Sequence, residues 1–121
     1  AEMRSGIDAI LDLGGFDRLA QQADLVITGE GSLDGQSVYG KVPVGVARRA
    51  KKYGKPVIAI AGGTGPGAES LFEYGIDALI SSTCRPMSVE EAVALWDELL
   101  ADAAERAMRL VKTGMDIMEE S

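Results

Sequence analysis

The stretch "DLVITGEGSLDGQSVYGKVPVGVARRAKKYGKPVIAIAGGTGPG", residues 24–67, decides the fold of this chain. It opens with an apolar run that ends in glycine, and a second apolar run near its end also leads into glycines. A short apolar run bounded by turn residues is typical of a strand buried on both faces. We therefore predict strands at Asp24–Thr28 and Pro56–Ala61, each followed by a glycine-rich loop.

Between these two strands the sequence predicts a helix that begins near Pro43. Proline is favoured in the first helical turn, because the N–H group that it lacks would have no partner there. Apolar residues then recur on one helical face from Val42 to Ala50, whereas the arginines and lysines of residues 48–52 are expected to face away. Gly54 is expected to end this helix.

Two short helices are predicted before the quoted stretch. Ser5 is a suitable N-cap for a helix that stops at Gly14 and Gly15, and Phe16–Gln22 indicates a second one. Together they would carry the chain to the first strand.

A helix, a strand and a final helix are predicted after the stretch. "AESLFEYG", residues 68–75, favours a helix closed by glycine, and a third strand is expected near Asp77–Ser81. Ser88 and Glu91 then form a capping-box pattern, followed by apolar residues at helical spacing. One long or bent helix is expected there, fraying after Gly114.

The alternation of strands and helices determines the predicted fold class. Connections of these lengths imply right-handed crossovers and a parallel sheet, so the class is α/β with helices covering both faces of the sheet. Only three strands are found, whereas sheets average about five or six. We therefore expect the chain to hold part of a larger α/β domain.

Composition limits the classes of function. The chain has 121 residues, 46% of them hydrophobic, and no apolar run near the roughly 20 residues of a membrane span. A net charge of −7 argues against nucleic-acid binding, which needs a basic face. One cysteine and no histidine exclude an intrachain disulfide, a zinc cluster and a histidine-dependent triad. We expect a cytoplasmic protein with no membrane or nucleic-acid partner.

The loops after the three strands are where ligands are expected, because open parallel sheets bind them beyond the carboxyl ends of their strands. In the first loop, Gly29 to Lys41, glycines would let backbone N–H groups approach an anion, and the lysine lies beside a helix start that attracts phosphate. Asp34 is suited to accepting a proton from an attacking hydroxyl or to holding Mg²⁺, with Glu30 as the alternative. Equally, "SLDGQS" is explained as a simple turn.

The other two loops leave alternatives open. Gly62, Gly63 and Thr64 match no Walker or complete dinucleotide motif, and either bind phosphate or carboxylate or form a plain turn. Arg85 follows the third strand and either forks onto a carboxylate or has a structural role. Trp96 is assigned to the core or to a partner contact.

Residues 24–62 resemble the signature region of the type 1 glycerate kinases, and "RSGIDAILDLGGFD" and "GIDALIS" are similar to the carboxyl-terminal region of that family. Three parts of the motif match: "GEG" at Gly29–Gly31; Asp34, Gln36 and Lys41; and "AG" ending the second strand. Ser32 stands where many members carry arginine. The resemblance adds Gly29, Glu30, Gly31, Asp34, Gln36, Lys41 and Gly62 to the loop analysis. From the two together we predict Asp34 and Lys41 for catalysis and Asp34 or Glu30 for Mg²⁺. The residues predicted for substrate or phosphate are Gly29, Glu30, Gly31, Ser32, Gln36, Gly62, Gly63, Thr64 and Arg85.

The resemblance also implies an activity and an architecture. Members phosphorylate D-glycerate with ATP and Mg²⁺, in a cleft between a flavodoxin-like domain, built from both ends of the chain, and an inserted α/β domain. Residues 1–121 would be the carboxyl-terminal part of the flavodoxin-like domain, inactive without the remainder of the enzyme. Exposed sheet edges indicate association with that remainder or, as a homo-oligomer, with a second copy. The alternative is a non-catalytic flavodoxin-like module that binds an anionic metabolite.

Overall fold

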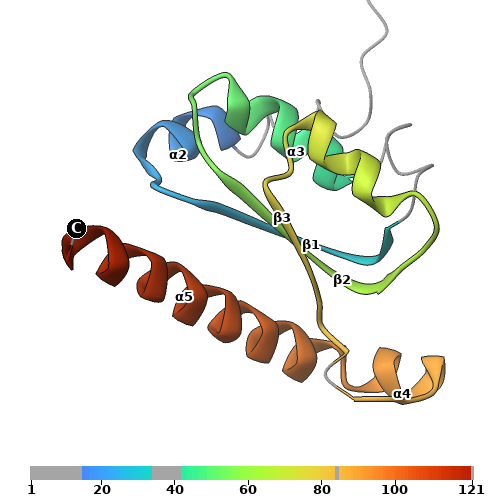
Figure 1. The fold of residues 1–121 in the computed structure, drawn as a ribbon. Coiled ribbons are helices and arrows are strands. Elements are labelled where there is room, and N and C mark those ends of the chain that lie inside the picture. Colours follow the sequence, from blue (N-terminus) through green and yellow to red (C-terminus); the bar gives the residue numbers. More distant parts are fainter. Residues whose placement is uncertain (1–14, 34–41, 84, 121) are drawn as a thin grey trace, which may run out of the picture.

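A three-stranded parallel sheet forms the centre of the molecule (Figure 1). The computed structural model describes residues 15–33, 42–83 and 85–120. Strands β1 (Val26–Leu33), β2 (Val57–Thr64) and β3 (Ala78–Ser81) lie in the order β1-β2-β3. Each connection therefore moves the chain by one strand in the same direction, and both strand pairs are parallel, as predicted.

Helices cover both faces of the sheet, which confirms the three-layer α/β class (Figure 1). Three of them lie on one face, namely α2 (Phe16–Gln22), α3 (Val42–Lys51) and the 3-10 helix η2 (Ala68–Tyr74). The long helix α5 (Trp96–Glu120) lies on the other face and contacts β2 and β3. The short helix α4 (Val89–Ala94) lies between β3 and α5. Among the described helices, none is long and apolar enough to cross a membrane.

The first two strands are longer at their carboxyl ends than predicted. β1 begins at Val26 rather than Asp24 and continues to Leu33, and β2 continues to Thr64. The two glycine segments pair with one another, Ser32 opposite Gly63 and Leu33 opposite Thr64. The prediction that loops begin at Gly29 and Gly62 is therefore wrong, because the ladder between neighbouring strands outweighs the weak strand preference of glycine.

Helix α3 is close to its predicted position, but one of its basic side chains is buried. Ala47 and Ala50 pack in the core with residues of β2, as the apolar pattern indicates. Arg49 was expected to face solvent, yet it is buried and its Nη1 lies 3.2 Å from Oδ1 of Asp17 in α2. Periodicity within α3 could not reveal that α2 covers this side and brings a carboxylate to meet the guanidinium.

At the amino end of the sheet, Asp77 ties α3 to β2. Its Oδ2 accepts hydrogen bonds from the backbone N–H of Val57, at 2.8 Å, and from Nζ of Lys51. Burial tends to raise the pKa of Asp77, but the hydrogen bonds from Lys51 and Val57 and the charge of Lys51 outweigh it and lower the pKa. These hydrogen bonds join α3, β2 and the start of β3 at this end of the sheet.

The apolar stripe at the end of the chain forms two helices. Ser88 caps α4 as predicted, since its side chain accepts a hydrogen bond of 3.1 Å from the N–H of Glu91. The helical path is interrupted at Leu95, and α5 then runs without a break through Gly114. The expected fraying after Gly114 is wrong; an ion pair between residues four apart, Lys112 with Asp116, spans that position, and Arg109 pairs with Glu105 one turn earlier.

The remaining predictions agree with the structure where it describes them. The helix at Phe16–Gln22 is confirmed, and the predicted helix before Gly75 is the 3-10 helix η2. Gly54 and Gly75 adopt the left-handed conformation that ends helices, with φ of 67° and 99°. The predicted helix after Ser5 lies outside the described residues.

Candidate functional site

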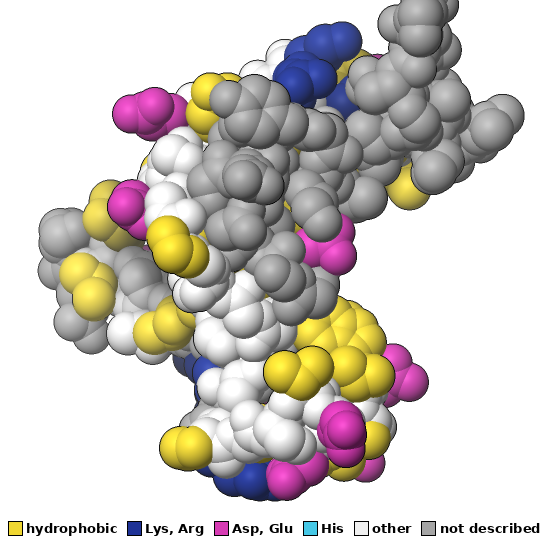
Figure 2. Space-filling view, turned by 90° about the vertical axis from the view of Figure 1, so that its right-hand side faces the viewer, with side chains coloured by type: hydrophobic (Ala, Val, Ile, Leu, Met, Phe, Trp, Pro, Cys, Tyr) yellow, Lys and Arg dark blue, Asp and Glu magenta, His cyan; other side chains and the backbone are white. Residues whose placement is uncertain are grey.

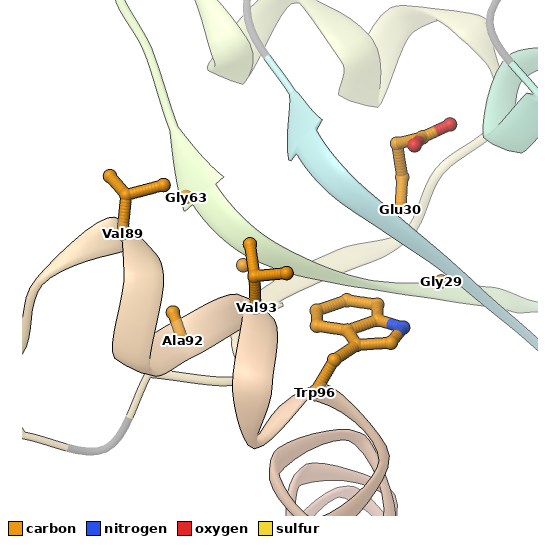
Figure 3. Close-up of a pocket in the computed structure, with 8 residues that line it drawn as sticks. Gly29, Glu30, Gly63, Val89, Ala92, Val93 and Trp96 are labelled. Carbon is orange, nitrogen blue, oxygen red and sulfur yellow. The ribbon is translucent and has the colours of Figure 1, made fainter.

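A cleft of about 660 Å³ lies between the carboxyl-terminal part of the sheet and helix α4 (Figure 3). One side is formed by two segments of neighbouring strands, Gly29 and Glu30 in β1 and Gly62 and Gly63 in β2. The other side is apolar and consists of Val89, Ala92, Val93 and Trp96. The cleft therefore lies where ligands bind in open parallel sheets.

The two strand glycines differ in what lies next to them. A Cβ atom on Gly29 would meet Cδ1 of Leu100, in α5, at 3.2 Å. A Cβ atom on Gly63 would meet nothing within 4 Å. The side of the sheet that faces α5 is therefore filled at Gly29, whereas the backbone at Gly63 is open to a ligand that approaches closely.

The chain that leaves β3 is fastened to the end of β2. The N–H of Ser82 donates to the carbonyl oxygen of Ala61 at 2.8 Å, and Oγ1 of Thr83 donates to that of Gly62 at 2.8 Å. Ser82 is itself buried. These bonds fix the exit from β3 beside the cleft, and so they set the point from which α4 starts.

Helix α4 presents unusually exposed apolar side chains to the cleft. Val89 is 80% exposed and Val93 is 71% exposed, and both point toward the strand ends near Gly63 (Figure 3). Figure 2 shows hydrophobic side chains gathered on the lower part of this face of the molecule, where α4 lies. The indole of Trp96, which is half-buried, extends from the start of α5 toward Gly29 (Figure 3).

Glu30 faces the opposite way from the apolar wall. Its carboxylate points away from Trp96, toward the side of the sheet that α3 covers (Figure 3). Successive residues of a strand alternate between faces, so Gly29 faces α5 and Glu30 faces the other side. Near the carboxyl ends of the strands, the sheet therefore carries a carboxylate, Glu30, on the face toward α3 and apolar side chains on the face toward α4 and α5.

The described residues offer only a partial site for a metal ion. They contain no group of three or more potential ligands among histidine, cysteine, aspartate and glutamate. Magnesium needs fewer, because it is commonly held by one or two carboxylates together with phosphate oxygens and water. Glu30 fits as one such carboxylate.

The structure brings four of the predicted site residues together and separates a fifth. Gly29, Glu30, Gly62 and Gly63 line one cleft. Arg85 does not line it; Nη1 of this arginine lies 3.6 Å from Oε2 of Glu91 in an exposed ion pair.

Other predicted residues lie within the strands or outside the described part. Gly31 and Ser32 belong to β1, and Thr64 ends β2. The predicted catalytic pair, Asp34 and Lys41, lies outside the described residues, as does Gln36.

The apolar wall was missed as part of a site. Val89, Val93 and Trp96 were predicted only as part of one helical stripe, and Trp96 was assigned to the core or to a partner contact. Their position was the signal that could have found them, because they follow directly the loop after the third strand. Any helix that starts there begins at the carboxyl edge of the sheet.

Comparison with known proteins identifies the family. Residues 1–112 match the model of the glycerate kinase family. The chain is 52% identical over 104 residues to the glycerate kinase of Halalkalibacterium halodurans, covering 86% of this chain and 27% of that protein. It is 44% identical over 92 residues to the glycerate 2-kinase of Escherichia coli, covering 76% of this chain and 24% of that protein.

Solved structures agree with the sequence comparison. A crystal structure from Salmonella typhimurium LT2, of a protein assigned as a glycerate kinase 2, superposes with a TM-score of 0.69 at 38% identity. It matches 96% of this chain, which spans 29% of that protein. The chain is thus about a quarter to a third as long as these relatives, and nearly all of it matches them. It belongs to the glycerate kinase family.

Proposed function

We propose that this chain supplies one wall of the active site of an ATP-dependent kinase that transfers a phosphoryl group to D-glycerate. One observation carries the proposal: glycine-containing segments of the neighbouring strands β1 and β2, Gly29–Glu30 and Gly62–Gly63, line one cleft within the segment that matches the glycerate kinase family. Glycines at such an edge let the backbone approach phosphate or substrate oxygens closely. The relatives named glycerate kinase support this choice of substrate.

The residues proposed for catalysis follow β1 directly. Asp34 accepts the proton of the attacking glycerate hydroxyl or holds the metal ion, and Lys41, which precedes α3, neutralises charge on the transferred phosphoryl group. Phosphoryl transfer needs little else from the protein, because it is catalysed mainly by positioning and by neutralising developing charge. The N–H groups in the first turn of α3 would add to the positive potential.

Glu30 is the described residue best suited to hold Mg²⁺. It lies at the rim of the cleft and points toward the α3 side, where Lys41 joins the helix. Bound Mg²⁺ would neutralise the phosphate oxygens of ATP and fix their position. The protein's part is to present the carboxylate beside the glycine backbone.

The second wall of the active site, facing the cleft described above, is proposed to come from the remainder of a longer enzyme. The relatives are roughly three to four times as long as the matched segments, which cover 24–29% of them. We propose that residues 1–121 are the carboxyl-terminal part of a flavodoxin-like domain in such an enzyme. Because one wall of an active site cannot position two substrates, residues 1–121 alone should have no kinase activity.

The test is release of ADP by the full-length polypeptide that carries this chain, supplied with ATP, Mg²⁺ and D-glycerate. Asp34→Asn should lower kcat by about 100-fold or more if the carboxylate is the base, because general bases contribute roughly 10²- to 10⁴-fold. Asp24→Asn is the matched control; Asp24 is exposed, precedes β1 and does not line the cleft, and its substitution should leave kcat unchanged.

The other outcomes separate the alternatives. ADP release that does not depend on D-glycerate, by a folded protein, would contradict the proposal and favour the non-catalytic module that binds an anionic metabolite. Full activity of Asp34→Asn with activity present in the wild type would remove Asp34 from the mechanism but keep the kinase. Activity of residues 1–121 alone would show that the second wall is unnecessary.

A further inference from the structure

We infer that the apolar side of the cleft, formed by Val89, Val93 and Trp96, holds the nucleobase of ATP and ADP rather than D-glycerate. The inference rests on the proposed function and assigns one of its two substrates to this site. It follows from the charge, the size and the two-sided arrangement of the cleft.

Charge disfavours D-glycerate at the apolar wall. Among the described residues that line the cleft, none is lysine or arginine, and the one charged side chain is the carboxylate of Glu30. A small carboxylate substrate would lose its hydration there without gaining a cation in return, which is costly. A nucleobase is uncharged and planar, so it loses little on entering an apolar cleft.

The aromatic ring and the exposed valines suit a base. Bases stack on aromatic side chains, because every base has a flat π face. Trp96 is the single tryptophan of the chain, and its indole extends along the cleft toward Gly29 (Figure 3). Val89 and Val93, 80% and 71% exposed, would lose that exposed apolar surface against a bound base.

Size gives the same answer. A volume of about 660 Å³ lies within the range of roughly 300–1,000 Å³ that is typical of pockets for cofactors and drug-sized ligands. A three-carbon acid would occupy a small part of this space. A nucleoside would fill much more of it.

The arrangement of the cleft gives the nucleotide a direction. With the base against Trp96, near Gly29, the phosphates would be directed over the carboxyl-terminal part of the sheet toward the side of β1 on which Glu30 lies (Figure 3). That is the side to which the metal ion and the start of α3 are assigned in the proposed reaction. One bound nucleotide would therefore contact all three features of the site: its base the apolar wall, and its phosphates the glycine-containing strand segments and the side with Glu30.

The experiment measures binding rather than turnover, in the full-length polypeptide that carries this chain. Isothermal titration calorimetry gives the Kd of MgADP and, separately, of D-glycerate. Trp96→Leu should raise the Kd of MgADP about 5- to 100-fold, the range expected for loss of one base–aromatic stack, and leave the Kd of D-glycerate unchanged. Trp96→Phe keeps a ring and should retain most of the affinity.

Two further variants make the test specific. Val93→Ser changes an exposed side chain, so it should fold normally, and it should raise the Kd of MgADP about threefold or more through lost apolar contact. Phe72→Leu is the matched control, because Phe72 is a half-exposed aromatic residue of η2, does not line the cleft, and should change neither Kd.

Each remaining outcome is informative. Weaker binding of D-glycerate with MgADP unaffected would overturn the inference and assign the wall to the acceptor. Unchanged Kd values for both ligands, or no binding of MgADP by the wild type, would also overturn it and favour a protein contact at α4. Weakened MgADP binding in an enzyme that does not phosphorylate glycerate would keep the nucleobase site while the proposed reaction fails.

Discussion

Helices α4 and α5 arise from one continuous apolar stripe, yet their side chains lie in opposite environments. In the first part of α5 the stripe is in the core: Leu99 is 8% exposed, and Ala103 is fully buried. In α4 the same spacing places Val89 and Val93 in the open. The break at Leu95 separates the two helices, and only α5 lies against the strands of the sheet. The difference teaches that periodicity defines an apolar face but not what covers that face.

The largest effect expected from this comparison comes from placing a charge on each helix. Ala103→Asp would put a carboxylate into the buried contact between α5 and the sheet, and should lower stability by about 3–5 kcal/mol. Val93→Asp should cost at most about 1 kcal/mol, because its side chain remains in water. Hydrogen exchange of the β2 amides in the full-length polypeptide measures both. Equal losses would contradict the comparison.

How far the sequence predicts the fold depends on how local each feature is. The positions of the three strands and the cap at Ser88 follow from short patterns, and the structure confirms them. The extension of β1 and β2 through their glycines depends on pairing between segments far apart in the chain. The burial of Arg49 likewise depends on Asp17 in another helix. Neither could be inferred from local propensity.

The candidate site was predictable in part for the same reason. Glycines in the carboxyl-terminal parts of two neighbouring parallel strands lie toward the same edge, so the segments that contain Gly29 and Gly62 could be assigned to one cleft from the sequence, although Gly29 pairs with Ile60. The place of the apolar wall near this edge could be inferred from its position after the third strand, but its exposure could not, because Val93 has the same spacing in the stripe whether it packs on the sheet or stands free. Whether a helix at this edge packs or stands free depends on the break at Leu95, which has no strong signal in the sequence.

A smaller effect is expected at the two strand glycines, and it sharpens the boundary between the region that α5 fills and the region that α4 leaves open. Gly29→Ala should cost about 1–2 kcal/mol, because the new methyl group must displace the end of Leu100. Gly63→Ala should change stability by no more than about 0.5 kcal/mol, since its Cβ meets nothing. Thermal unfolding of the two variants compares them directly, and similar losses would show that α5 does not fill the edge at Gly29.

The smallest effect concerns the cap of α4 and asks whether the two helices open together. Ser88→Ala removes the acceptor for the N–H of Glu91 and should cost α4 about 1 kcal/mol of local stability. Because Leu95 interrupts the helical path, exchange should accelerate at the amides of Glu91 and Ala92 and stay unchanged in α5. Ser88→Asp, which restores a capping oxygen, should restore protection. If exchange in α5 rose as much as in α4, the two helices would be one cooperative unit, and the wall of the cleft would be as firmly held as the core beneath it.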